Sequence, residues 1–183
     1  MHKITPKKKF GQNFLTDQSI AEKIILSAGD IKNKSIIEIG GGSGNLTKYL
    51  LKAKPKKLIV IEIDKDYSNI LSKVLENSTI EAKLIFDDVL NTDIYSHFSE
   101  PPVVFGNLPY NISTKILAKL LEGENGAPKW EKLLLMFQLE VANRIVAKPH
   151  TKQYGRLSLL SQFYSLPSLN SRFLKTLSSQ SQR

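Results

Sequence analysis

The chain has 183 residues, 41% of them hydrophobic, which suits a globular domain with an interior core. It contains no cysteine, which excludes disulfides, thiolate nucleophiles and thiolate metal sites. No apolar stretch approaches the ~20 residues of a membrane helix, and no apolar region follows the lysine-rich start as it would in a signal peptide. We therefore expect a cytoplasmic protein with no membrane partner.

The net charge of +9 is unevenly distributed along the chain. The first residues form a basic arm with Lys3, Lys7, Lys8 and Lys9. No Asp or Glu follows Glu140, whereas seven basic residues do: Arg144, Lys148, Lys152, Arg156, Arg172, Lys175 and Arg183. Clustered positive charge favours a nucleic acid partner, bound through its phosphates, over the alternative of a solvated basic surface.

Short apolar runs alternate with segments of helical spacing. An opening helix is expected around Ile20–Ala28, with Thr16 or Asp17 as its N-cap. The runs that read as strands are 36–39, 58–63, 84–86, 103–105 and 133–137. The intervening helical faces are Leu46, Leu50 and Leu51; Tyr67, Ile70, Leu71 and Val74; Ile116, Leu117, Leu120 and Leu121. Residues 123–128 read as a loop. This alternation predicts an α/β fold with a mostly parallel, doubly wound sheet and helices on both faces.

A glycine-rich turn, Gly40–Gly44, follows the first expected strand and precedes a helix. Glycines allow a sharp turn and a close approach of ligand to backbone, so Gly40 and Gly42 are candidate ligand-binding positions. Position 45 is Asn, where the dinucleotide fingerprint requires glycine, and no Gly-Lys-Ser/Thr triplet follows. The turn therefore suits a nucleoside ligand without a pyrophosphate.

Acidic residues end the second and third expected strands. Glu62 is the first choice to accept hydrogen bonds from the two hydroxyls of a ribose, and Asp64 is the second, with helix capping as its alternative role. Asp87 or Asp88, at the end of the third strand, can accept a hydrogen bond from the amine of an adenine. Because the carboxyl ends of parallel strands share one edge of the sheet, we expect these groups near the glycine turn.

The fourth expected strand runs into Asn107, Leu108, Pro109 and Tyr110. The Asn107 side chain can accept a hydrogen bond from the exocyclic amine of a base, and Pro109 disfavours helical geometry at Leu108, whose carbonyl can accept a second. Tyr110 offers a ring for stacking, worth about 1–3 kcal/mol per base. Seen alone, the segment is also compatible with a simple turn into a helix.

Several of these segments together resemble the ribosomal RNA adenine N6-dimethyltransferases, especially the small-subunit enzymes. The matching segments are Lys9–Leu15, Glu38–Gly44, Val60–Asp64, Phe105–Thr114 and Tyr154–Ser158. The resemblance implies a Rossmann-like fold that binds S-adenosylmethionine and methylates adenines of small-subunit ribosomal RNA twice at N6.

The resemblance also assigns roles to single residues. It implies that Asn13, Leu15, Gly40, Glu62, Asp88 and Asn107 contact S-adenosylmethionine, which selects Asp88 over Asp87. Catalysis is then expected at Asn107, Leu108, Pro109 and Tyr110. The three histidines, His2, His97 and His150, are scattered, so we expect neither a catalytic histidine nor a metal. The expected partner is the small ribosomal subunit, bound by a monomer.

The resemblance ends near residue 165. Family members continue with two more strands, a Phe-x-Pro-Pro-Pro-Lys-Val type segment and a small helical domain, none of which is recognised here. We expect a methyltransferase domain at residues 1–165 that is incomplete at its end, a divergent, frayed tail at 166–183, and the strand 133–137 at a sheet edge. We also expect weak or absent activity on ribosomal subunits, with cofactor binding retained. The alternatives are a large-subunit adenine methyltransferase of the macrolide-resistance type and a non-catalytic RNA-binding or ribosome assembly factor.

Overall fold

The computed structural model describes residues 18–123 and 126–170. Two compact units are distinguished, and each is described by itself. The first comprises the chain up to Ile112 together with Trp130–Met136, and the second comprises Ser113–Lys129 and the residues from Phe137 onward. Asn13, Leu15 and the proposed caps Thr16 and Asp17 lie outside the described residues.

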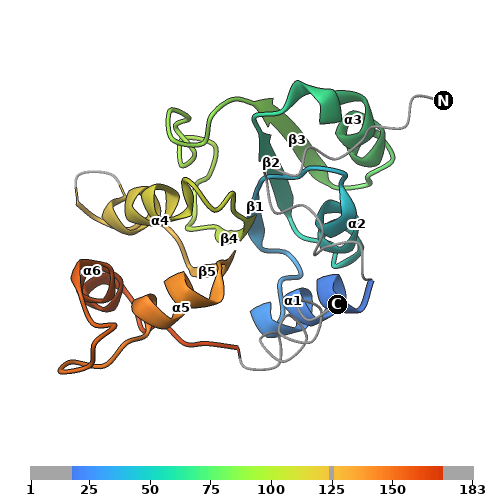
Figure 1. Cartoon of the computed structure of the whole chain (residues 1–183). Coiled ribbons are helices and arrows are strands. Elements are labelled where there is room, and N and C mark those ends of the chain that lie inside the picture. Colours follow the sequence, from blue (N-terminus) through green and yellow to red (C-terminus); the bar gives the residue numbers. More distant parts are fainter. Residues whose placement is uncertain (1–17, 124–125, 171–183) are drawn as a thin grey trace, which may run out of the picture. The chain divides into compact units, whose positions relative to one another are not determined.

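The first unit contains a five-stranded parallel sheet in the order β3-β2-β1-β4-β5 (Figure 1). Its elements in chain order are α1 (Gln18–Ala28), β1 (Ser35–Ile39), α2 (Asn45–Lys52), β2 (Lys57–Glu62), the 3₁₀ turn η2 (Lys65–Tyr67), α3 (Ser68–Glu76), β3 (Glu81–Phe86), β4 (Val103–Asn107) and β5 (Lys132–Met136). The predicted parallel α/β sheet and its five strands are confirmed.

Burial explains why these strands were visible in the sequence. The residues of β1 are all buried, as are those of β2 after Lys57 and those of β4 up to Gly106. Strands covered on both faces consist of continuous apolar runs, which is the pattern that predicted them. The end strands β3 and β5 are only half-buried, and β5 lies at a sheet edge as expected.

The strand boundaries differ from the prediction where the chain leaves the core. β3 begins at Glu81, earlier than expected, because an edge strand tolerates polar residues and Glu81 forms an ion pair with Lys57 at 2.7 Å. β2 ends at Glu62, and the side chain of the next residue, Ile63, is exposed. β5 ends at Met136, one residue before the expected limit.

The second unit contains three helices within the described residues: α4 (Ser113–Glu122), α5 (Leu139–Ile145) and α6 (Arg156–Tyr164). Both α4 and α5 contact α6. The helical face predicted in α4 is confirmed, since Ile116, Leu117, Leu120 and Leu121 are buried. The sequence analysis did not predict α5 or α6, which are short and bury few side chains. No helix in the described part of the chain has the length and apolar character to cross a membrane.

Candidate functional site

The order of the strands reverses beside β1, and the crevice at such a point is where open α/β sheets bind ligands. Gly40 follows β1, and Asn107 is the last residue of the neighbouring strand β4. Gly40 has a φ of 79°, and a Cβ atom there would lie 3.4 Å from the Asn107 carbonyl oxygen. The glycine turn and the Asn-Leu-Pro-Tyr segment are therefore direct neighbours, as the sequence predicted for a shared site.

The glycine turn fits closely against the sheet. A Cβ atom at Gly41 would lie 2.5 Å from Cγ1 of Val60, a distance that leaves no room for a side chain. The turn is fixed by hydrogen bonds that the Gly40 and Gly44 N–H groups donate to the carbonyls of Ile61 and Gly41, at 2.8 and 2.9 Å. At Gly42, with a φ of 50°, a Cβ atom would meet nothing within 4 Å. This glycine thus borders open space, where a ligand can approach the backbone.

Glu62 connects the end of β2 to the glycine turn. Its Oε2 accepts a hydrogen bond from the Gly42 N–H and its Oε1 accepts one from the Asp64 N–H, both at 2.8 Å. The residue is buried, so these two bonds fix the carboxylate in one orientation. A carboxylate has about four lone-pair sites, and the two that remain can accept the hydroxyls of a ribose.

The other acidic residues differ in how many of their carboxylate oxygens accept local hydrogen bonds. Asp64 caps η2, because its Oδ1 accepts the Asp66 N–H at 3.0 Å, so the capping alternative holds for this residue. Both oxygens of Asp87 accept bonds within its own loop, from the Asp88 N–H and the Thr92 hydroxyl. Asp88 uses Oδ1 for the Leu90 N–H at 2.9 Å, which leaves Oδ2 outside the hydrogen bonds found among the described residues.

Glu38 is a feature of this site to which the sequence analysis gave no role. It lies in β1, next to the glycine turn, and is 1% exposed. Burial raises the pKa of its carboxyl to about 8, and the nearby Glu62 carboxylate contributes to the rise. The neighbouring Thr47 lowers the pKa of Glu38, but by less than burial raises it. In the described residues, Glu38 Oε2 and Thr47 Oγ1 meet no atom within hydrogen-bonding geometry. The signal in the sequence was a carboxylate inside an apolar run that leads into glycines.

The Asn-Leu-Pro-Tyr segment is anchored through its leucine. The Leu108 side chain is buried, and it comes so close to Gly106 that a Cβ atom there would lie 2.8 Å from Leu108 Cδ2. Asn107 is half-buried and Tyr110 is 41% exposed. A turn then closes with a hydrogen bond from the Ile112 N–H to the Pro109 carbonyl at 3.2 Å. The buried Leu108 therefore anchors the segment, with the amide of Asn107 before it and the accessible ring of Tyr110 after it.

Three of the predicted groups therefore adjoin one another in the first unit, because the Gly40–Gly44 turn bonds to Glu62 and lies next to Asn107. Asp88 follows the end of β3, the strand that pairs with β2. The predicted contacts of Asn13 and Leu15 lie outside the described residues. Within the described ranges, no three His, Cys, Asp or Glu side chains are grouped so that they could hold a metal ion.

A parallel sheet in this order, with a glycine turn, a carboxylate and a polar segment at its carboxyl ends, defines the class of Rossmann-like methyltransferases. Two solved structures support this class: a dimethyladenosine transferase from Plasmodium falciparum (TM-score 0.67, 33% identity, 80% of this chain and 50% of that one) and the 23S rRNA methyltransferase ErmE (TM-score 0.64, 28% identity, 81% and 55%). The family model for ribosomal RNA adenine dimethylase matches residues 3–178, so the chain belongs to that family.

Curated relatives agree with this assignment. The ribosomal RNA small subunit methyltransferase A of Pelagibacter ubique is 47% identical over 160 residues, which cover 87% of this chain and 60% of the relative. The protein of the same name from Mesomycoplasma hyopneumoniae strain 232 is 47% identical over 163 residues, again 60% of its length. The chain thus spans about three-fifths of the length of the curated relatives that it matches.

Proposed function

We propose that the protein transfers methyl groups from S-adenosylmethionine to the N6 amine of adenines in small-subunit ribosomal RNA, forming dimethyladenine. Family membership and the names of the relatives support this reaction. The observation that carries it is the adjacency of the two halves of the site. Only 3.4 Å would separate a Cβ atom at Gly40, in the glycine turn, from the Asn107 carbonyl at the start of the base-holding segment. A cofactor on the turn and a base at that segment would therefore meet.

The residues present fit S-adenosylmethionine. Gly42 borders open space, and the Glu62 carboxylate is held with lone pairs to spare for the ribose hydroxyls. Asp88 is the proposed acceptor for the adenine amine of the cofactor, and Asn107 the residue at its reactive end. From the resemblance to the family, we propose that Asn13 and Leu15 complete the set. When bound, the cofactor supplies a methyl group made electrophilic by a positively charged sulfur.

The chain's own part in the reaction is to hold and orient the target amine. We assign the side-chain oxygen of Asn107 and the Leu108 carbonyl to accept its two N–H groups. These bonds favour a pyramidal nitrogen whose lone pair points at the methyl group, and alignment of this kind can contribute several of the ~7–11 kcal/mol available to proximity. Pro109 keeps the Leu108 carbonyl out of a helix, and Tyr110 stacks on the flipped base. The proton can leave to water after transfer, so no histidine is needed.

The test is to incubate the chain with labelled S-adenosylmethionine and unmethylated small ribosomal subunits, and then to map dimethyladenine in the RNA by mass spectrometry. We expect dimethyladenine in small-subunit RNA only, and none without the protein. Because the expected activity of this chain on ribosomal subunits is weak, the label is followed long enough to detect slow transfer. Binding of cofactor and subunits without any transfer would contradict the proposal and favour an assembly factor.

A second candidate function is methylation of large-subunit RNA, because the chain is also similar to the 23S rRNA methyltransferase ErmE. The small-subunit assignment is preferred because the relatives with 39–47% identity carry small-subunit names, whereas ErmE is 28% identical. The same experiment with large subunits separates the two functions.

We further propose that the protein is a cytoplasmic monomer and that its reaction needs no metal, so a chelator should leave the rate of methyl transfer unchanged. The domain boundary at residue 165 stays a prediction.

A further inference from the structure

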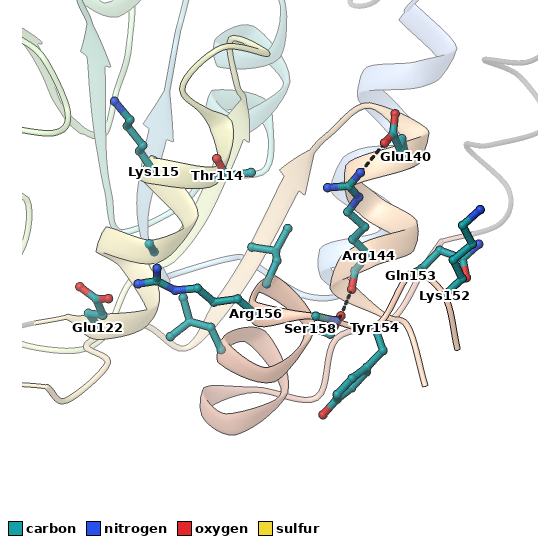
Figure 2. A pocket seen from close by; sticks show the side chains of 14 residues that line it. Thr114, Lys115, Glu122, Glu140, Arg144, Lys152, Gln153, Tyr154, Arg156 and Ser158 are labelled. Atoms are coloured by element: carbon teal, nitrogen blue, oxygen red, sulfur yellow. Dashed lines mark hydrogen bonds and ion pairs between the residues drawn. The ribbon is translucent and has the colours of Figure 1, made fainter. Parts of the chain in front are cut away.

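A wide groove in the second unit is not used by the proposed chemistry. It has a volume of about 1010 Å³ and lies among α4, α5 and the segment that leads into α6 (Figure 2). All of its lining residues belong to the second unit and to the described part of the chain. We therefore considered which ligand its side chains suit.

Positive charge dominates the lining. The basic residues are Lys115, Arg144, Lys152 and Arg156, against the acidic Glu122 and Glu140. Glu140 is already engaged, because its Oε1 lies 2.6 Å from the Arg144 guanidinium (Figure 2). Lys152 and Arg156 are exposed and have no ion pair among the described residues. The groove thus retains cationic groups that are available to an anion.

Hydrogen bonds fix the backbone on which the two arginines stand. The Ser158 hydroxyl donates to the Arg144 carbonyl at 2.5 Å and accepts the Gly155 N–H at 3.1 Å. The Gln162 side chain donates to the Ala147 carbonyl at 2.8 Å. Ser158 is fully buried, so these bonds connect α5 rigidly to the first turn of α6. The backbone at Arg144 and next to Arg156 is therefore fixed before any ligand arrives, although both side chains are exposed and the Arg144 guanidinium is paired with Glu140.

Gly155 is a glycine that the fold does not require. Its φ of −167° is extended backbone that any residue adopts, and a Cβ atom there would meet nothing within 4 Å. The residue lines the groove between Tyr154 and Arg156. The missing side chain leaves the groove open at this point, which is what close approach of a ligand to the backbone needs.

We propose that this groove binds the phosphodiester backbone of the substrate RNA, an inference that rests on the proposed function. Guanidinium groups suit phosphate oxygens because their planar N–H donors can bind two oxygens at once. The neighbouring Tyr154, half-buried at the groove, offers a ring on which a nucleobase can stack. The combination of cations, a bare backbone and an aromatic ring favours RNA over an acidic peptide.

The test compares two double variants of the full chain that lose the same charge. Lys152→Gln with Arg156→Gln alters the groove, and Lys23→Gln with Lys83→Gln alters exposed positions of the first unit. Binding of a short fluorescent single-stranded RNA is measured by anisotropy over a range of salt concentrations. Each phosphate contact contributes about 0.7 to the slope of log affinity against log salt, so the groove variant should lose about 1.4 and bind about tenfold more weakly at about 0.15 M salt. The control should lose much less.

Lysine acetylation of the unmodified protein gives a second measurement that does not depend on a variant's folding. RNA should protect Lys115 and Lys152 and leave Lys23 and Lys83 reactive. Equal losses of affinity in both double variants, or absence of protection at Lys115 and Lys152, would overturn the proposal. So would binding of polyglutamate but not of RNA, which would indicate a protein partner. If the chain transfers methyl groups but the groove variants bind RNA normally, only the RNA-binding role of the groove is refuted. If RNA binds at the groove but no methyl group is transferred, only the proposed function is refuted.

Discussion

Polar residues are bonded differently at the two ends of the parallel sheet in the first unit. At the amino ends of the strands, charged groups pair with one another: Lys34 with Glu131 at 2.8 Å, Lys56 with Glu100 at 3.0 Å and Lys57 with Glu81 at 2.7 Å. These pairs are mostly exposed, and they satisfy the charges where the strands begin. Within the described residues, none of the groups assigned to the proposed site lies at this end of the sheet.

At the carboxyl ends, polar groups come together with bonding capacity left over. Glu38 is buried, with one oxygen that has no hydrogen-bond partner within the described ranges, and Glu62 is held by two backbone N–H groups. Gly40, Gly42 and Gly44 of the adjacent turn adopt positive φ angles, and glycine loses more conformational entropy on folding than any other residue. Such an arrangement is unfavourable for stability and useful for binding, as is common where function is built into a fold. The predictions below test this contrast.

The largest effect should follow from Asn107→Ala at the carboxyl end. The change removes the acceptor aimed at the charge that develops on the target amine, and loss of one such preorganised group typically costs about 10²–10³-fold in rate. Transfer of labelled methyl should fall accordingly, whereas cofactor affinity, measured by calorimetry, should change much less. Asn111→Ala is the matched control, because Asn111 is an exposed asparagine of the following turn. If the Asn107→Ala variant transfers methyl groups at the parent rate, Asn107 does not have the role in the reaction that we propose.

Glu62→Gln should weaken cofactor binding. An amide places N–H donors opposite the Gly42 or Asp64 N–H, and it removes a charged acceptor from the ribose position. Bonds to charged groups are worth about 1.5–3 kcal/mol, so the cofactor Kd should rise about 10–100-fold. The control is Asp64→Asn, the same chemical change two residues later, where the carboxylate only caps a short 3₁₀ turn. Equal losses of affinity in the two variants would show that Glu62 has no special role.

Much of this end of the sheet could be predicted from the sequence, because the chemistry is local there. The glycine turn, Glu62 and Asn107 each stand at the end of a continuous apolar run, and parallel strands bring such ends together. The edge strand β3 was predicted too short, since its polar first residues carry no apolar signal. Glu38 had no assigned role because nothing in a single sequence says that its carboxyl would be buried without a full set of partners.

The groove of the second unit could not be predicted in the same way. Arg144 lies in α5 and Arg156 begins α6, and the Ser158 hydroxyl connects the two helices because it bonds both the Arg144 carbonyl and the Gly155 N–H. The two helices were not predicted because both are short and expose much of their surface. The general basic character of this region was visible in the sequence, but its three-dimensional arrangement depended on hydrogen bonds that no residue pattern indicates.

Glu38→Gln should flatten the pH dependence of stability. The pKa of this carboxyl is about 8 in the folded protein and about 4.5 when it is unperturbed, so between these values the folded state binds one proton more than the unfolded state. The free energy of unfolding should therefore decrease as pH rises through this range, by up to about 1.4 kcal/mol per pH unit from this group. Urea unfolding between about pH 5 and pH 8 measures it. Parallel curves for the variant and the parent would contradict a buried, neutral Glu38.

The smallest effect should come from the amino end, where Lys34→Met removes the partner of Glu131. Both side chains of this pair are 44% exposed, and water screens exposed ion pairs strongly. The melting temperature should change by less than about 4 °C, and high salt should reduce the difference further. Cofactor affinity should be the same as in the parent chain, because these charges lie where the strands begin and the proposed site lies where they end. A variant at position 34 that loses cofactor binding while it stays folded would break the contrast between the two ends of the sheet.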